Sequence, residues 1–161
     1  MTPEQAFGPP GDFFIDPVRP VARALITHGH ADHARPGNTA VLATQQTLDI
    51  MAIRYGAAFA QSSQAAEWGK PISFGDCTVT FHPAGHVLGS AQIAVECGGL
   101  RIVASGDYKR RHDPSCQAFE LVPCDIFITE ATFGLPVFRH PDSKAEVAKL
   151  LRSVSQFPDR T

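Results

Sequence analysis

The sequence lacks the long apolar segments that mark membrane proteins and exported proteins. None of its 161 residues lies in a stretch that approaches the roughly 18 consecutive apolar residues of a membrane span. Met1 is followed by Thr-Pro-Glu-Gln rather than by a basic segment and an apolar run. We therefore expect no association with membranes and a cytoplasmic location.

Paired cysteines and an overall basic charge are also missing. The four cysteines, Cys77, Cys97, Cys116 and Cys124, form no C-x-x-C pair and follow no regular spacing, so we expect unpaired thiols rather than a zinc knuckle or a disulfide framework. The formal net charge of -2 provides no general field that attracts nucleic acid. Any anionic substrate must therefore be held by local groups.

The apolar pattern predicts strands first, with helices between and after them. The predicted strands lie at residues 13–15, 22–27, 41–43, 72–74, 77–81, 93–97, 100–104 and 125–129. Period-two alternation makes those between 72 and 104 a run of antiparallel strands. Thr44 can cap a helix that ends at Gly56, and Ser143 with Glu146 forms a capping box for a second helix. This order indicates an α/β or α+β layer fold.

The segment His28-Gly29-His30-Ala31-Asp32-His33 holds three of the seven histidines and follows the strand predicted at 22–27. On a helix, two histidines two positions apart would point about 200° from each other, but in a loop both rings can converge on one ion. Asp32 and His33 could serve a second ion, and such mixed nitrogen and oxygen ligation suits zinc or manganese. A polar loop with incidental histidines is the alternative.

Further ligands are expected at the ends of other strands, where loops carry functional groups. His86, in HPAGHVLGSAQ, follows the strand at 77–81 and is flanked by Gly85 and Gly89, which permit close backbone approach. Asp107, in ASGDYKRR, follows the strand at 100–104, and a carboxylate there can bridge two cations. Taken alone, each has an ordinary alternative as a polar turn histidine or a capping aspartate.

Together these segments resemble the metallo-β-lactamase fold, specifically its nucleic-acid-cleaving β-CASP branch. The motifs occur in the order H-x-H-x-D-H, G-H-x-L-G-S, S-G-D-Y and then Glu130 in ITEATFG. Longer stretches, GDFFIDPVRPVARALITHGHADHARPG, PAGHVLGSAQI, SGDYKRRHDP and CDIFITEATFGLPVF, are similar to the bacterial ligase-associated DNA exonucleases, which are mRNA 3'-end processing factor-like. The resemblance covers about residues 10 to 141.

The resemblance implies a four-layer αββα fold of β-sheets flanked by helices. Residues 1–141 would form the amino-terminal part of the metallo-β-lactamase domain, and residues 142–161 would begin a helix leading into a cap domain. In the family, later strands return one more metal-binding histidine and a histidine acid, and neither His112 nor His140 fits those positions. We therefore expect an amino-terminal fragment of a longer protein, which alone lacks part of the site.

The resemblance also implies two zinc ions as cofactors, with manganese as an alternative. The first would be held by His28, His30 and His86, and the second by Asp32, His33 and the bridging Asp107. Asp16, in FFIDP, would brace the histidine loop by hydrogen bonds, unless it simply precedes a proline turn.

Asp32 and Glu130 are the carboxylates expected to act in catalysis. Glu130 would position a downstream histidine that protonates the leaving oxygen. Lys109 and Arg110 would contact a phosphate backbone, with a solvated charged turn as the alternative.

The implied function is hydrolysis of DNA by a metal-dependent exonuclease with a bridging hydroxide, in a repair setting with a DNA ligase and a helicase as partners. One alternative is an RNA-processing nuclease of the same branch. Another is a hydrolase of the same fold that acts on a lactam, thioester or small phosphoester, but such enzymes need no segment like ITEATFGLPVF. The third is a metal-binding fragment with an incomplete catalytic site.

Overall fold

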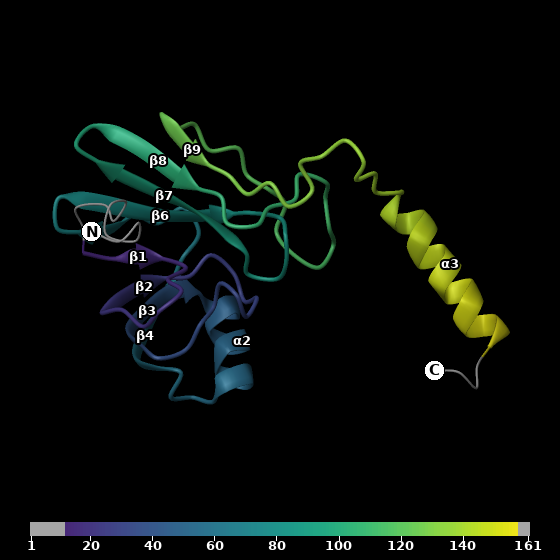
Figure 1. Ribbon diagram of the computed structural model, residues 1–161, viewed down its shortest axis with the longest axis horizontal. Helices are drawn as coiled ribbons and strands as arrows, with labels where there is room; N and C mark the ends of the chain where they lie inside the picture. The colour runs from purple at the N-terminus through teal and green to yellow at the C-terminus, as the bar shows by residue number, and fades with distance from the viewer. Residues whose placement is uncertain (1–11, 158–161) are drawn as a thin grey trace. The chain divides into compact units, whose positions relative to one another are not determined.

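The computed structural model describes residues 12–157, which divide into two compact units, one ending at Glu130 and the other beginning at Ala131. Within the described residues, the first unit contains two β-sheets and one helix, and the second contains one helix (Figure 1). No helix in this part of the chain is both long enough and apolar enough to span a bilayer.

The first sheet has four parallel strands in the order β1-β2-β3-β4. They are β1 (Phe14–Ile15), β2 (Arg23–Leu25), β3 (Asn38–Thr44) and β4 (Ala60–Ala66). The first three lie where apolar runs predict strands, although β2 is shorter and β3 longer than expected. No pattern predicts β4, because its sequence AQSSQAA is mostly polar and exposed. Since all four strands are parallel, their carboxyl ends share one edge of the sheet.

Helix α2 (Gln45–Tyr55) follows β3 directly and packs on the parallel sheet. Its predicted caps are confirmed: the Thr44 hydroxyl accepts a hydrogen bond from the backbone N–H of Thr47, and Gly56 ends the helix with a φ of 86°. Leu48 and Met51 of the helix join Ala24, Ile26, Val41 and Ala43 in one apolar cluster. The helix therefore starts at the edge of the sheet where the strands end.

The second sheet has five strands in the order β5-β6-β7-β8-β9. They are β5 (Ile72–Phe74), β6 (Cys77–Pro83), β7 (Ala91–Cys97), β8 (Leu100–Ala104) and β9 (Ile126–Ile128). The antiparallel run predicted between residues 72 and 104 is confirmed, whereas β9 pairs with β8 in parallel. Consequently β6, β8 and β9 run in the same direction, and their carboxyl ends lie at one edge.

The two sheets pack face to face through one core. Leu25 and Leu42 of the first sheet meet Val79, Phe81 and Ile93 of the second in a single apolar cluster. Because neighbouring residues of a strand point to opposite faces, Ala24 and Val41 face α2 instead. The order of layers is thus helix, parallel sheet and mixed sheet, as can be followed in Figure 1.

A disulfide joins Cys77 and Cys97 across the β6–β7 hairpin. The prediction of unpaired thiols is wrong for this pair. The two residues are 20 positions apart, and only the register of the hairpin brings them opposite each other. Cys116 and Cys124 are free and partly buried.

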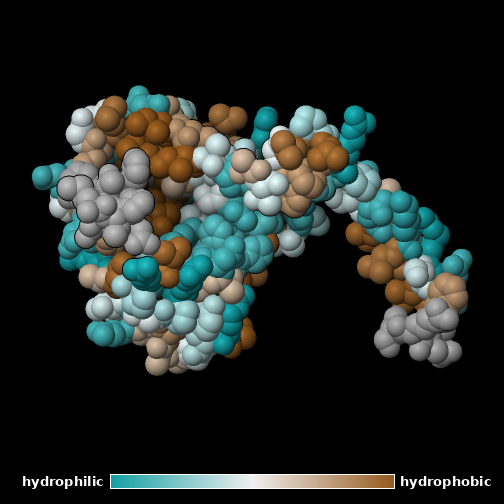
Figure 2. All heavy atoms as spheres, viewed as in Figure 1, coloured by the Kyte–Doolittle hydropathy of each residue, from teal (hydrophilic) through white to brown (hydrophobic). Residues whose placement is uncertain are grey.

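Helix α3 (Ser143–Gln156) belongs to the second unit. Its cap is Asp142, whose carboxylate accepts from the backbone N–H of Ala145 at 3.0 Å, so the predicted cap at Ser143 is wrong by one residue. The helix carries four large apolar residues that are all exposed, Val147, Leu150, Leu151 and Val154. Figure 2 shows hydrophobic side chains gathered along one side of this helix.

Candidate metal centre

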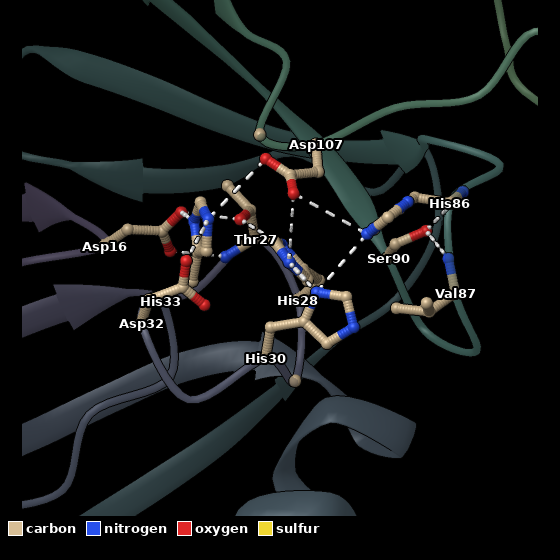
Figure 3. Close-up of polar contacts among 12 residues, drawn as sticks. Asp16, Thr27, His28, His30, Asp32, His33, His86, Val87, Ser90 and Asp107 are labelled. Carbon is tan, nitrogen blue, oxygen red and sulfur yellow. Dashed lines mark hydrogen bonds and ion pairs between the residues drawn. The ribbon is translucent and has the colours of Figure 1, made fainter. Parts of the chain in front are cut away.

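The loops that carry the predicted ligands meet where strands of both sheets end. The loop from His28 to His33 follows β2, His86 lies between β6 and β7, and Asp107 follows β8. The backbone N–H of Ala91 donates to the Thr27 carbonyl at 2.7 Å and so joins the two sheets beside the site. Figure 3 shows the side chains pointing toward one another. His86 and Asp107 therefore lie close to the first histidines.

Four side chains form the tighter part of the cluster. Nδ1 of His30 lies 3.0 Å from Nε2 of His28 and 3.3 Å from Nε2 of His86. Oδ2 of Asp107 lies 3.9 Å from Nε2 of His28 and 3.6 Å from Nε2 of His86. Four ligands arranged tetrahedrally at zinc–nitrogen bond lengths are about 3.3 Å apart. The spacing and chemistry of these four groups therefore fit one divalent ion.

His33 stands on the other side of Asp107 and directs its two ring nitrogens to different partners. Nδ1 lies 2.8 Å from Oδ2 of Asp16. Nε2 lies 3.7 Å from Oδ2 of Asp32 and 3.6 Å from Oδ1 of Asp107. One oxygen of Asp107 thus faces His28 and His86 while the other faces His33, which is the arrangement that a bridging carboxylate requires.

Asp16 follows β1 and has a left-handed backbone, with a φ of 46°. Its Oδ1 accepts from the backbone N–H of Thr27 at 2.8 Å, and its Oδ2 accepts from the Thr27 hydroxyl at 2.6 Å. Asp16, His28 and His33 also lie close enough to form a ligand group, but both oxygens of Asp16 already have hydrogen-bond donors. A carboxylate that accepts from the far nitrogen of a histidine fixes the orientation of that ring and increases its basicity.

Burial and neighbouring charges give the histidines opposite charge preferences. Burial of His28 lowers its pKa to about 3, with a further lowering by nearby His33. Burial also lowers the pKa of His86. In contrast, the hydrogen bond to Asp16 raises the pKa of His33. His28 and His86 are therefore neutral near pH 7, the state in which an imidazole binds a metal ion.

Two acidic residues lie beside the cluster. A hydrogen bond from its own backbone N–H holds the pKa of Asp32 below the usual range, so this carboxylate is ionised at neutral pH. Glu130 follows β9 and lines a cavity of about 340 Å³ together with Asp32, His33 and Asp107. The negative charge of Glu130 also acts on His86, where it favours the protonated ring.

The two basic residues predicted to contact phosphate are not among those that line this cavity. Lys109 forms an ion pair with Asp113 at 2.7 Å, and this contact is the main reason that the pKa of Asp113 is lowered. The Arg110 side chain is exposed. Lys109 already has an anionic partner, whereas Arg110 is accessible.

Sequence reasoning missed two residues that hold the ligands in place. The Thr27 hydroxyl lies 3.0 Å from Nδ1 of His28 in addition to its contacts with Asp16. The Ser90 hydroxyl accepts from the backbone N–H groups of His86 and Val87 at 3.0 and 3.1 Å. The available signals were the position of Thr27 directly before the first histidine and the serine four residues after His86.

Comparison with known proteins gives sequence relatives that are much longer than this chain. No family model matches it. It is 30% identical over 157 residues to a probable DNA ligase of Opitutus terrae, covering 92% of this chain and 14% of that protein. It is also 30% identical over 151 residues to endoribonuclease YSH1 of Gibberella zeae, covering 92% of this chain and 17% of that protein. The chain thus spans less than a fifth of either relative.

One further relative matches a shorter part of the chain, and one solved structure has a similar fold. Over 76 residues the chain is 34% identical to cleavage and polyadenylation specificity factor 73 of Drosophila melanogaster, which covers 45% of this chain and 11% of that protein. A protein of unknown function from Enterococcus faecalis has a similar fold, with a TM-score of 0.58 and 14% identity over 83% of this chain and 39% of that one. That likeness concerns the fold alone.

Proposed function

We propose that the chain belongs to the nucleic-acid-cleaving β-CASP branch of the metallo-β-lactamase fold and provides the metal centre of an enzyme that hydrolyses phosphodiester bonds. Its alignment along 92% of its length with a probable DNA ligase and with an endoribonuclease supports this proposal. One observation carries this proposal. Ligand atoms of His28, His30, His86 and Asp107 all lie within 4.8 Å of one another although they come from three loops on two sheets.

The proposed cofactors are two zinc ions, with manganese as an alternative. His28, His30 and His86 would hold one ion, Asp32 and His33 would hold the other, and Asp107 would contact both. Bound ions of this kind supply an activated water and neutralise charge on a phosphate. The described residues prepare the site: burial keeps His28 and His86 neutral, and Asp16 accepts from Nδ1 of His33 so that Nε2 faces Asp107.

The acidic residues have separate proposed roles. Asp32, which is exposed beside His33, is proposed to hold the second ion and to act in catalysis. Glu130 faces the cavity without belonging to either close group of candidate ligands, and this placement supports a role in proton transfer through a histidine outside this chain. Arg110, and Lys109 once it leaves Asp113, are the proposed phosphate contacts.

The finer fold assignment belongs to the same proposal. The described layers, helix, sheet and sheet, would be three layers of an αββα fold. Residues 1–141 would form the amino-terminal part of the metallo-β-lactamase domain, and residues 142–161 would begin the helix that leads into a cap domain.

The proposed substrate is DNA, degraded from an end, in a repair setting with a ligase and a helicase as partners. The resemblance of the motifs to ligase-associated exonucleases supports this choice, as does the ligase relative that aligns with 92% of the chain. RNA is the second candidate, because an endoribonuclease aligns with the same share of the chain.

The test uses this chain and the longest product that its gene encodes. Each is incubated with single-stranded DNA and RNA of matched sequence, labelled at one end, under manganese and then zinc, with a His30→Ala variant as the control. We expect DNA to shorten progressively from one end and the variant to be inactive. Cleavage of RNA alone would overturn the DNA assignment, and internal cuts would overturn the exonuclease assignment. If the wild-type products bind metal but cleave neither polymer, the nuclease proposal is overturned, and the remaining hypothesis is a metal-binding protein with an incomplete catalytic site.

A further inference from the structure

Helix α2 contacts two of the ligand loops, one near each of its ends, and in both cases the contact is with a glycine. We propose that α2 is a positioning element that sets the distance between the His28–His30 pair and His86. This inference rests on the proposed metal centre. It is carried by contacts of Arg54 and Ile50 with Gly29 and of Thr44 and Thr47 with Gly89.

The carboxyl-terminal half of α2 holds the first loop. Nη1 of Arg54 donates to the Gly29 carbonyl at 2.6 Å. The side chain of Ile50 lies so close to Gly29 that a Cβ there would be 2.9 Å from Ile50 Cγ2. Gly29 lies between His28 and His30, so a charged hydrogen bond and an apolar contact act on the peptide that joins the two ligands.

The amino-terminal end of α2 holds the second loop. The buried hydroxyls of Thr44 and Thr47 donate to the Gly89 carbonyl at 2.7 and 3.2 Å, and a carbonyl oxygen can accept both. Gly89 has a φ of 76°, and a Cβ there would lie 2.7 Å from Cβ of Gln46. The next residue, Ser90, accepts from the backbone N–H of His86 (Figure 3). The helix therefore holds Gly89, and the adjacent Ser90 holds the backbone of His86.

The two threonines differ in a way that separates positioning from helix capping. Thr44 both caps the helix and donates to Gly89, so replacing it changes two functions at once. The Thr47 hydroxyl donates to the same carbonyl and lies 3.0 Å from the Thr44 hydroxyl, whereas the donor that Thr47 provides to the cap is its backbone N–H. Thr47→Val removes the hydroxyl, preserves the branched shape and leaves the cap donor, and Thr47→Ser is the matched control that keeps the hydroxyl.

Arg54 provides an independent variant at the other loop. Its side chain is exposed, so Arg54→Met has little effect on the core. Arg54→Lys retains a cationic donor and serves as its control. The two pairs of variants act on loops from different sheets.

The experiment measures two properties of the 161-residue chain. The first is the zinc dissociation constant, by competition with a chromophoric chelator. The second is amide hydrogen exchange of the metal-free chain at His86 and Val87, whose N–H groups bond to Ser90. We expect Thr47→Val to weaken zinc binding by about 10- to 100-fold and to speed exchange at both amides, and Thr47→Ser to behave like wild type. Arg54→Met should weaken zinc binding and Arg54→Lys should restore much of it.

The two readouts distinguish failure of this inference from failure of the proposed function. If the wild-type chain folds but binds no zinc, the proposed metal centre is refuted, and the exchange rates still test the helix. Unchanged exchange and affinity in Thr47→Val and Arg54→Met would overturn the positioning role. Equal losses in each variant and its conservative control would also overturn it, because the hydroxyl and the charged donor would then be irrelevant.

Discussion

The two sides of the ligand cluster differ in burial and charge although the segment from His28 to His33 contributes residues to both. His28 is completely buried, whereas the Asp32 side chain is 75% exposed. The pKa of His28 is lowered mainly by burial, and that of His33 is raised by its hydrogen bond to Asp16. We call the group of His28, His30 and His86 the histidine side and the group of Asp16, Asp32 and His33 the acidic side, which lines the cavity together with Glu130. The difference shows that tertiary neighbours set the ionisation of a histidine.

Asp107→Ala should have the largest effect, because this residue has an oxygen on each side of the cluster. We expect loss of activity and loss of more than half of the bound metal, as measured by elemental analysis of purified protein. His30→Ala should also abolish activity, but it removes a ligand from the histidine side only. If Asp107→Ala retained its full metal content, the bridging assignment would be wrong.

Glu130→Gln tests whether an acidic residue beside the acidic side can contribute to the cleavage rate without binding metal. We expect full metal content and a rate lowered by about a hundredfold to ten-thousandfold, since a positioned proton-transfer group contributes that much. The measurement compares metal content with the rate of phosphodiester cleavage in the longest product of the gene. Metal loss equal to that of Asp107→Ala would make Glu130 a ligand instead.

Asp16→Asn should weaken the acidic side selectively. The amide keeps the shape of the side chain but loses the negative charge that Nδ1 of His33 faces at 2.8 Å. We expect the weaker-binding ion to dissociate about 10- to 100-fold more readily, because hydrogen-bond partners of metal-binding histidines contribute effects of this size. A stepwise zinc titration measures it, with Asp49→Asn on the exposed face of α2 as the control. Equal weakening of both binding steps would contradict a selective role.

The smallest effect is the pH dependence of the metal-free chain. Because the pKa of His28 falls from 6.5 to about 3 on folding, the unfolded chain binds a proton between these values that the folded chain does not. His28 therefore lowers the free energy of unfolding as the pH falls below 6.5, by at most about 1.4 kcal/mol per pH unit. The raised pKa of His33 acts in the opposite direction, since its contribution is complete at low pH and is lost as the pH rises through that value.

Urea unfolding of the metal-free chain between pH 7 and pH 5 separates the two histidines. We expect His28→Asn to flatten the loss of stability toward pH 5 and His33→Asn to steepen it. Identical slopes in wild type and both variants would show that neither ring changes its pKa on folding.

Sequence patterns predicted those strands and helix ends that are marked by residues only a few positions apart. Alternation predicted the β5–β8 run, and Thr44 and Gly56 predicted the ends of α2. The polar strand β4 was missed because parallel pairing with β3, rather than apolar alternation, places it in the sheet. The Cys77–Cys97 disulfide was missed for a similar reason, since hairpin register is not visible in cysteine spacing.

Residue identities and local patterns along the chain are enough to show which side chains can bind metal and that they follow strands, because ligand identity and the period of alternation are local properties. Three relations are visible only in the folded chain. His86 and Asp107 face His28. Asp16 orients His33, and α2 contacts two of the ligand loops. These relations depend on two sheets packing so that their strand ends coincide. Distances between side chains from different sheets follow from that packing, and no spacing along the chain encodes them.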